Sequence, residues 1–390
     1  MGWNSWNSGI PLTEQTTRDT IDAMVSSGMR DAGYRYVNLD AGWAAPTRDA
    51  HGDLRADPDR FPSGIAALAH YAHDRGMYLG VYHSPFNEGC GQAPAVAGAG
   101  HEQADARTIA GWGVDYLKYD WCRADADHDE QVRYFVAMRD ALRASGRSIV
   151  YSINPNSSTD PSAGSEYDWS RIADVSRDGN DLVPAWGDAA LWQEGLQGVS
   201  QAFTTAATVT SHDGSPGGRA HVNDPDMLVV GIPWTAFVAG HPTMSLGPQR
   251  PDLTDAEQRA HFSLWAMLAA PLLAGNDVRT MTRTTRDILT NRDVIAVDQD
   301  ALGVQGHALA GVPSVIVKPL ADGSVAVALF NAGGVSTEIR TDAKSIGLPS
   351  SDCYSVRDLW EHTDSTTSGD LGQTVPVHGV AMLRVRVACR

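Results

Sequence analysis

Up to about residue 300, short apolar runs alternate with amphipathic segments. Five of these runs predict buried strands by their length and composition, at residues 34–39, 77–82, 114–119, 148–152 and, more weakly, 173–176. Between the runs, apolar residues recur at helical spacing, as at Ile21, Met24 and Met29 in a helix that we expect to begin near Thr13. Alternating strands and helices predict right-handed crossovers and a parallel sheet. The number of repeats favours a (β/α)8 barrel over a doubly wound sheet.

A second helix is predicted near residue 254, where Thr254-Asp255-Ala256-Glu257 forms a capping-box pattern ahead of an apolar segment. After about residue 305, the hydrophobic pattern changes to strand-like runs joined by turns, without intervening helices. The runs 314–317 and 324–330 flank the turn sequence 321–323, and the run 382–387 follows the turn-like residues 377–379. The pattern predicts an α/β chain in which a (β/α)8 barrel at 1–304 precedes an antiparallel β-sandwich at 305–390.

Polar side chains cluster where the predicted barrel strands stop. Such residues in a barrel face the mouth of the active site, although a single one is usually a cap or a turn former. Their succession here predicts a lined pocket that includes Asp40, His83, Asp120, Asn154, Arg177, Asp178 and residues 223–226.

Asp120 is the sharpest candidate for chemistry in this pocket. Lys118 lies two residues earlier, so both side chains are on the same face of the strand. The ammonium group would keep Asp120 ionised, although a purely structural ion pair is an equally good interpretation of the two residues. Acid–base chemistry needs a second carboxylate. The spacing leaves Asp178, Asp181, Asp224 and Asp226 open for that role.

Composition narrows the function classes. The chain has 30 Lys and Arg against 47 Asp and Glu, which gives a formal net charge of −17. This balance disfavours nucleic acid as a partner, and no apolar stretch approaches the length of a membrane span. The 13 His residues form no paired metal-binding motif, so a metal-dependent hydrolase is a weak alternative, and no metal or cofactor is expected.

The four cysteines have no zinc-site spacing. Their grouping into an early pair, Cys90 and Cys122, and a late pair, Cys353 and Cys389, fits two disulfides or four buried thiols. A disulfide-bonded chain would belong to an oxidising compartment. Because Met1 leads straight into a motif, we expect that an upstream leader has been removed and that the protein is secreted or periplasmic.

Several separated segments, taken in order, resemble glycoside hydrolase family 27, the family of α-galactosidases and α-N-acetylgalactosaminidases. The resemblance runs from residue 1 to about 390, and its motifs lie at residues 1–6, 39–40, 116–122, 223–228, 295–300 and 302–306. It implies a (β/α)8 barrel followed by a β-sandwich, and retaining hydrolysis of a terminal α-D-galactoside.

The resemblance also implies roles for individual residues. Asp120 matches the nucleophile, and Asp181 matches the acid/base because it follows Arg177 by four residues, which favours it over Asp178. Cys90 and Cys122 match a family disulfide. The remaining residues are expected to bind an oligosaccharide or glycoside substrate: Trp6 as a platform under the sugar ring, Lys118 and Arg177 as hydroxyl donors, and Asp40, Tyr82, Asn154 and Asp226.

Two departures from the family pattern bear on the sugar. Ala41 stands where the family has a second aspartate that binds the outer hydroxyls of galactose, and Asn154 stands where it has Glu or Ser. A site that lacks one acceptor discriminates epimers less well.

Two sister activities therefore stay open beside the α-galactosidase. A β-L-arabinopyranosidase is disfavoured by the retention of Asp40, whereas an isomaltodextranase fits Ala41 because glucose has an equatorial O4. A non-catalytic carbohydrate-binding barrel is a distant alternative, since both Asp120 and Asp181 are present. The oligomeric state is left open.

Overall fold

The computed structural model describes residues 1–86, 96–125, 127–157, 159–187, 190–191, 195–209, 221–244 and 246–388. The chain forms two compact units. The first consists of Met1–Pro251 and Pro271–Thr282, and the second of Asp252–Ala270 and Arg283–Arg390. The predicted boundary between residues 304 and 305 stays a prediction.

Eight parallel strands form the sheet of the first unit, in the order β10-β1-β2-β3-β4-β5-β6-β9. Leu228, just after β9, pairs with Ala274 of β10 and thereby joins the two edges of the sheet. The barrel predicted from the sequence is confirmed. Its strands are β1 (Gly2–Asn4), β2 (Tyr36–Leu39), β3 (Tyr78–His83), β4 (Tyr116–Asp120), β5 (Val150–Asn154), β6 (Val175–Arg177), β9 (Val222–Asp224) and β10 (Leu273–Ala274).

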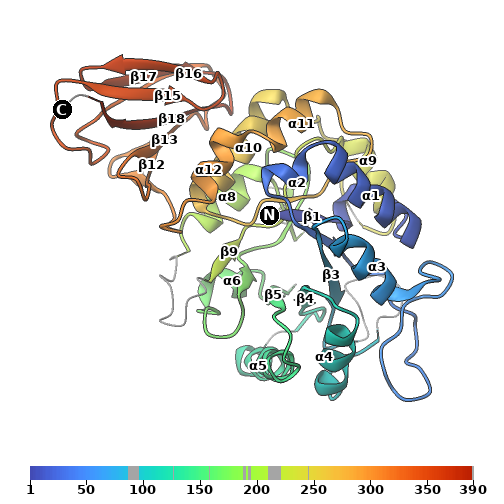
Figure 1. Cartoon of the computed structure of the whole chain (residues 1–390). Helices are drawn as coiled ribbons and strands as arrows, with labels where there is room; N and C mark the ends of the chain where they lie inside the picture. Colours follow the sequence, from blue (N-terminus) through green and yellow to red (C-terminus); the bar gives the residue numbers. More distant parts are fainter. Residues whose placement is uncertain are drawn as a thin grey trace. The chain divides into compact units, whose positions relative to one another are not determined.

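Helices follow the strands along the chain and surround them (Figure 1). Thr13 caps the first long helix by accepting a hydrogen bond from the Thr16 N–H at 3.1 Å, which confirms the predicted start. The short parallel pair β7 (Asp181–Leu182) and β8 (Leu196–Gln197) is inserted after β6. The helices of this unit are η1 (Trp6–Ser8), α1 (Glu14–Ser26), α2 (Met29–Ala32), α3 (Gly64–His73), α4 (Glu102–Gly111), α5 (His128–Ala144), α6 (Ala163–Glu166), α8 (Val199–Ala206) and α9 (Trp234–Gly240).

Each predicted run contains a strand, but the strands begin one or two residues later than the runs. Val114 shows the reason: its side chain is fully buried, yet its backbone N–H donates to the Ile109 carbonyl in the turn that enters β4. Burial therefore extends the apolar run beyond the residues that pair. At the other end, strands β3 to β6 extend into polar residues, and this places those side chains at the mouth of the barrel.

Within its described residues, the second unit contains three helices and an antiparallel sheet in the order β11-β12-β13-β18-β15-β16, with a separate pair β14-β17. The predicted capping box of α10 (Asp255–Leu268) is present, because Thr254 and Glu257 exchange hydrogen bonds. The other elements are α11 (Arg283–Leu289), α12 (Arg292–Asp298), β11 (His307–Leu309), β12 (Val312–Pro319), β13 (Val325–Phe330), β14 (Thr337–Asp342), β15 (Tyr354–Asp358), β16 (Thr363–Thr367), β17 (Asp370–Val375) and β18 (Val380–Val387).

Alternate residues of β13 point to opposite sides of this sheet. Val325, Val327 and Leu329 join a core that also contains Ile339 of β14 and Leu371 of β17. Both antiparallel sheets thus contribute to one apolar layer, as the predicted β-sandwich requires.

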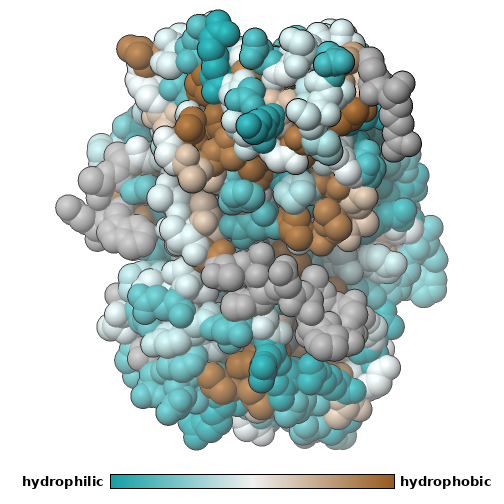
Figure 2. Space-filling model, turned by 90° about the vertical axis from the view of Figure 1, so that its left-hand side faces the viewer, coloured by the Kyte–Doolittle hydropathy of each residue, from teal (hydrophilic) through white to brown (hydrophobic). Residues whose placement is uncertain are grey.

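The face drawn in Figure 2 is hydrophilic over much of its area, and hydrophobic residues gather there in separate patches. Among the described residues, no helix has both the length and the apolar character needed to cross a membrane.

Candidate active site

A cavity of about 130 Å³ opens where the barrel strands end, and its lining contains all nine predicted catalytic and substrate-binding residues. Strands β3 to β6 supply five of these residues directly, and the others follow β1, β2, β6 and β9 in the chain. The lining consists of Trp6, Asp40, Ala41, Tyr82, Lys118, Asp120, Asn154, Arg177, Asp181, Asp226, Met227, Thr243 and Met244.

Lys118 lies between two carboxylates on the floor of this cavity. Its Nζ donates to Asp40 Oδ2 at 2.8 Å and lies 3.7 Å from Asp120 Oδ2. The two residues of β4 therefore share a face, as their spacing predicted. Asp40 is held further by the Asn4 side chain, 3.0 Å from Oδ2, and by the Ala41 N–H, 2.8 Å from Oδ1.

Burial raises the pKa of Asp120 to about 6, and Lys118 is the main opposing influence. Burial acts to lower the pKa of Lys118 in turn, but the charges of Asp120 and Asp40 outweigh it and raise that pKa. Lys118 therefore stays charged, and Asp120 is mostly ionised at neutral pH.

Arg177 connects two further carboxylates. Its Nη2 donates to Asp181 Oδ1 at 3.1 Å, and its Nη1 lies 3.2 Å from Asp226 Oδ1. The guanidinium is fixed by the carbonyl oxygens of Gly179 and Asn180, at 3.1 and 2.8 Å. One buried cation thus orients both carboxylates.

The two carboxylates that share Arg177 differ in their ionisation. Burial acts to raise the pKa of Asp181, but Arg177 and Lys118 outweigh it and lower that pKa. Burial raises the pKa of Asp226 despite Arg177. The Asp181 side chain is 50% exposed, whereas that of Asp226 is 5% exposed, so only Asp181 is open to the cavity mouth.

Asp226 has a backbone φ of 91°, a conformation that non-glycine residues rarely adopt. Three hydrogen bonds hold it there: its N–H donates to Asp224 Oδ1 at 2.9 Å, and its carboxylate accepts from the Leu182 and Met227 N–H groups at 2.8 and 2.7 Å. Such strain persists only where surrounding contacts enforce it, and it is common at functional sites.

Aromatic residues form part of the cavity wall. Trp6 is half-buried, and its ring centroid lies 5.4 Å from that of His241, with the planes tilted by 56°. The Tyr82 hydroxyl lies 2.8 Å from Cys122 Sγ. A partly exposed indole face is a suitable surface for an apolar face of a sugar ring.

The two departures from the family pattern both lie in the cavity lining. Ala41 contributes a methyl group where a carboxylate is expected, next to Asp40. Asn154 Oδ1 accepts hydrogen bonds from the Asn156 N–H and side-chain amide, at 3.2 and 3.0 Å. The Asn154 side chain consequently presents its NH₂ donor, rather than an acceptor, to other partners.

The structure separates the four carboxylates that the sequence left open. Asp181 and Asp226 line the cavity, whereas Asp178 and Asp224, 1% and 5% exposed, do not belong to its described lining. Burial raises the pKa of Asp178 well above its usual range, which suits a neutral carboxylic acid. Cys90 and Cys389 lie outside the described residues, so both cysteine pairings stay predictions.

Sequence reasoning did not assign roles to Met227, Thr243 and Met244, which complete the cavity wall. Met227 lies inside a recognised motif and could have been included on that basis. Thr243 and Met244 follow α9 in a turn, and neither residue type nor spacing marks them in the sequence. Among the described residues, no cluster of three or more His, Cys, Asp or Glu could hold a metal ion.

Comparison with known proteins identifies the family. A family model described as alpha galactosidase A matches residues 7–300, and one described as alpha galactosidase C-terminal beta sandwich domain matches residues 310–385. The chain belongs to the α-galactosidase family. This is glycoside hydrolase family 27, as its motifs indicated, and the chain is a glycosidase.

Relatives in the α-galactosidase family match the chain over nearly its full length. α-Galactosidase A of Cellvibrio japonicus is 36% identical over 99% of this chain and 91% of its own. An α-galactosidase of Cyamopsis tetragonoloba is 38% identical over 98% and 84%. The structure of α-galactosidase I from Mortierella vinacea superposes with a TM-score of 0.85 at 30% identity, over all of this chain and 96% of its own.

A β-L-arabinopyranosidase structure from Geobacillus stearothermophilus has a TM-score of 0.77 at 22% identity, covering all of this chain and 96% of its own. This likeness shows a common fold.

Proposed function

We propose that the protein is an exo-acting α-galactosidase that retains anomeric configuration through a covalent glycosyl-aspartate. The observation that carries the proposal is the joint presence of Asp120 and Asp181 in one cavity, each contacted by its own cation. Relatives with 35–38% identity that carry the name α-galactosidase support the sugar. The proposal assigns Asp120 as nucleophile and Asp181 as acid/base.

In the first step, a carboxylate oxygen of Asp120 attacks the anomeric carbon. The bond from that carbon to the leaving oxygen breaks, and Asp181 gives its proton to this oxygen. In the second step, Asp181 takes a proton from a water molecule that attacks the same carbon. The ester bond to Asp120 then breaks, and the sugar leaves with its original configuration.

The charges around the cavity act on the protonation of both carboxylates. Arg177 and Lys118 lower the pKa of Asp181, which favours its ionised form, the base of the second step. Asp120 is the nucleophile in its ionised form, which a pKa of about 6 provides at neutral pH. The charge of Asp181 helps to raise the pKa of Asp120, and this repulsion acts equally in the other direction. Formation of the ester removes the charge of Asp120 and with it this repulsion. Asp181 therefore releases its proton more readily and is ionised as the base of the second step.

The size of the cavity supports cleavage at a chain end. About 130 Å³ is well below the roughly 300–1,000 Å³ typical of sites for larger ligands. Such a cavity accommodates one terminal sugar, with the rest of the substrate outside. A Saccharomyces cerevisiae α-galactosidase structure with raffinose, at 26% identity and a TM-score of 0.81, supports α-galactosyl oligosaccharides as the substrate class.

A panel of glycosides tests the sugar. We expect turnover of p-nitrophenyl α-D-galactoside and raffinose in preference to p-nitrophenyl β-L-arabinopyranoside, p-nitrophenyl α-glucoside and isomaltooligosaccharides. Turnover of p-nitrophenyl β-L-arabinopyranoside without turnover of the α-galactoside would contradict the proposal and identify a β-L-arabinopyranosidase. Release of isomaltose from α-1,6-glucan would identify an isomaltodextranase, the activity that Ala41 favours.

The variant Ala41→Asp examines the missing acceptor directly. A new carboxylate beside Asp40 can accept a hydrogen bond from an outer hydroxyl, and we expect about a tenfold rise in the ratio of kcat/KM for α-galactoside over α-glucoside. Ala41→Asn is the matched control, because it has nearly the same shape without the charge. An unchanged ratio in Ala41→Asp would show that this acceptor does not limit discrimination.

A further inference from the structure

Asn156 lies just beyond β5, outside the described lining of the candidate active site, and its side-chain amide joins three segments around that site. Its Nδ2 donates to Asn154 Oδ1 at 3.0 Å and to the Gly179 carbonyl oxygen at 2.9 Å, with the Arg177 carbonyl oxygen at 3.3 Å. Its Oδ1 accepts from the Gly164 N–H of α6 at 2.9 Å. The NH₂ group and the oxygen of this amide are therefore both used within the protein.

The orientation of the Asn156 amide is fixed by partners that can act in one way only. A backbone N–H can only donate, so the atom that faces Gly164 is the oxygen, and a carbonyl oxygen can only accept, so the atom that faces Gly179 is the nitrogen. A Cβ at Gly164 would overlap the Arg177 carbonyl oxygen, so α6 packs directly against the end of β6 beside this amide. Aspartate and leucine have nearly the same size as asparagine but lack the donor.

The Gly179 carbonyl that Asn156 holds is part of the support of Arg177. Arg177 Nη2 donates to the Gly179 carbonyl oxygen at 3.1 Å and to Asp181 Oδ1 at 3.1 Å. A carbonyl oxygen has two lone pairs, so Gly179 can accept from Asn156 and Arg177 together. A chain of three hydrogen bonds thus leads from Asn156 to the carboxyl of Asp181.

The other support of Arg177 is built in the same way. The Asn180 carbonyl oxygen accepts from Arg177 at 2.8 Å and from the Gln197 side-chain amide at 2.7 Å. Gln197 belongs to the short β7-β8 ladder, and β7 contains Asp181, so replacing Gln197 would disturb the strand pair as well. Asn156 lies outside that ladder, and its contribution can be measured separately.

We propose that Asn156 is a positioning residue for the acid/base, Asp181. It fixes the Gly179 carbonyl, which holds Arg177 and, through it, the carboxyl of Asp181. Because the Asp181 side chain is 50% exposed, packing alone does not fix it, and the hydrogen bond from Arg177 matters more. The efficiency of a general acid depends on its being held within hydrogen-bond reach of the leaving oxygen. The role of Asn156 rests on the proposed function, which assigns Asp181 as acid/base.

Leaving-group dependence tests the proposal, because a poor leaving group needs protonation in the first step and p-nitrophenolate does not. We expect Asn156→Ala to raise the ratio of kcat/KM for p-nitrophenyl α-D-galactoside over raffinose by about tenfold, the effect of losing one well-placed hydrogen bond. An unchanged ratio overturns the proposal. This includes an equal loss on both substrates, which would indicate an effect on sugar binding through Asn154 instead.

Asn156→Ser is a second variant that decides the question where Asn156→Ala does not fold. The serine hydroxyl ends one bond short of the amide nitrogen, so the same rise in the ratio is expected. Thr159→Ala is the matched control, because Thr159 is exposed in the same loop and donates to the Ala124 carbonyl oxygen. It should keep the wild-type ratio. A rise equal to that of Asn156→Ala would attribute the effect to the loop as a whole and overturn the proposal.

The double variant Asn156→Ala/Asp181→Asn separates the proposed route from general damage. If Asn156 acts through Asp181, the ratio in the double variant should match that in Asp181→Asn within about twofold. A further rise of about tenfold would show that the two residues act independently, which overturns the proposal.

Failure of the proposed function is distinguishable from failure of the role of Asn156. Without a rise of the ratio in Asp181→Asn, Asp181 is not the acid, and the role of Asn156 is overturned with it. A rise in Asp181→Asn without one in Asn156→Ala contradicts the role of Asn156 alone. If the panel of glycosides identifies another sugar, its p-nitrophenyl glycoside and its oligosaccharide replace the two substrates.

Discussion

Arg177 is the residue on which the arrangement of the candidate active site depends most. Its guanidinium contacts Asp181 and Asp226 at 3.1 and 3.2 Å, while Gly179 and Asn180 fix it through their carbonyl oxygens. When two carboxyls share one cation, their protons leave in steps that belong to the pair. Asp181, the more exposed member, is the one that we propose as the acid/base.

Substitution of the two proposed catalytic carboxylates should have different effects. Asp120→Asn removes the nucleophile and should abolish turnover of every substrate. Asp181→Asn should reduce raffinose hydrolysis by about 10²–10⁴-fold, the usual contribution of general acid–base catalysis, but should affect the first step on p-nitrophenyl galactoside less. Burst and steady-state kinetics separate the two steps.

Asp178→Asn is the control for these variants, because the amide resembles the neutral acid that burial favours at that position. We expect this variant to stay within a few-fold of the wild type. If Asp181→Asn loses the same activity on both substrates, the acid role of Asp181 is contradicted. If Asp178→Asn loses more activity than Asp181→Asn, Asp178 is the acid instead.

The pH dependence of kcat/KM should report Asp120. Because its pKa is raised to about 6 and the nucleophile is the ionised form, kcat/KM should rise with pH through that value. The charge of Lys118, 3.7 Å from Asp120 Oδ2, lowers the pKa of Asp120. Lys118→Met removes this charge and should therefore raise the pKa of Asp120, so the acid limb should move to higher pH. Lys118→Arg keeps the charge and should retain the wild-type limb. Coincident limbs in Lys118→Met and the wild type would contradict this electrostatic coupling.

Sequence reasoning recovered the strands of the barrel whose apolar runs are long. It predicted β4 with Lys118 and Asp120 on one face, which the ion pair confirms. It did not predict β1, β9 or β10, which contain three, three and two residues and are too short to show a periodic pattern. Their pairing depends on partners distant in the sequence, such as Leu228 with Ala274.

The residues of the candidate site could be gathered from the sequence for a related reason, and their roles stay predictions. Polar residues at strand ends are visible in a sequence, so Asp40, Asp120, Asn154 and Arg177 could be placed at one mouth. The preference for Asp181 over Asp178 came from resemblance, because spacing alone does not show which side chain is exposed. Thr243 and Met244 reach the cavity only through the folding of the segment after α9, and no local pattern encodes that.

Helix α10 offers a test at the scale of one element. Thr254 is exposed and caps the helix through reciprocal hydrogen bonds with Glu257. Thr254→Ala leaves a backbone N–H without its acceptor and should destabilise the protein by about 1 kcal/mol. Thermal unfolding measures the effect as a decrease in Tm.

Thr204→Ala is the control for the helix cap. Thr204 is exposed within α8 and donates to the Ser200 carbonyl oxygen at 2.7 Å, a contact that a helix interior does not need. Because alanine has the higher helix propensity, this variant should be neutral or slightly stabilising. A decrease in Tm equal to that of Thr254→Ala would show that loss of a hydroxyl, rather than of the cap, causes the effect.

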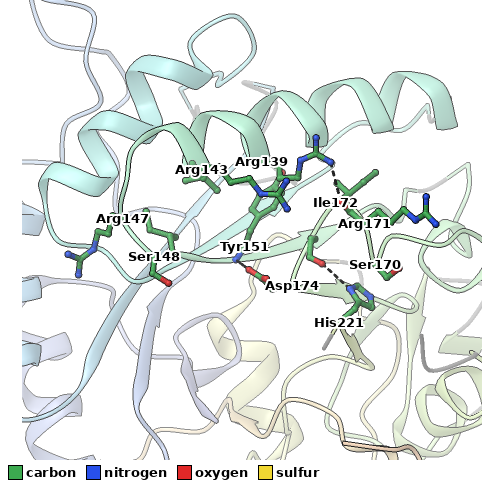
Figure 3. Close-up of a pocket in the computed structure, with 13 residues that line it drawn as sticks. Arg139, Arg143, Arg147, Ser148, Tyr151, Ser170, Arg171, Ile172, Asp174 and His221 are labelled. Carbon is green, nitrogen blue, oxygen red and sulfur yellow. Dashed lines mark hydrogen bonds between the residues drawn. The ribbon is translucent and has the colours of Figure 1, made fainter. Parts of the chain in front are cut away.

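At the scale of the whole molecule, the acidic charge acquires a spatial pattern. Several of the 47 acidic side chains line the candidate active site, where Lys118 and Arg177 form ion pairs with their carboxylates. At the opposite ends of β5 and β6, four arginines and Asp174 line a second cavity (Figure 3). A net charge of −17 therefore does not describe the local charge at either cavity.

The early cysteine pair connects two predictions about the whole protein, its disulfide and its secretion. Cys90 and Cys122 are 32 residues apart, so a bridge would restrict the unfolded chain and stabilise the fold by about 4 kcal/mol. Cys90→Ser tests this while leaving Cys122 Sγ beside the Tyr82 hydroxyl, at 2.8 Å in the cavity wall. We expect a lower Tm in Cys90→Ser, and an equal decrease when the wild type is reduced.

Alkylation of the unreduced wild type followed by mass spectrometry should leave both cysteines unmodified, because a thiolate is the reactive form. Modification of Cys90 under these conditions would show that the disulfide is absent. The main argument that the protein belongs to an oxidising compartment would then be lost.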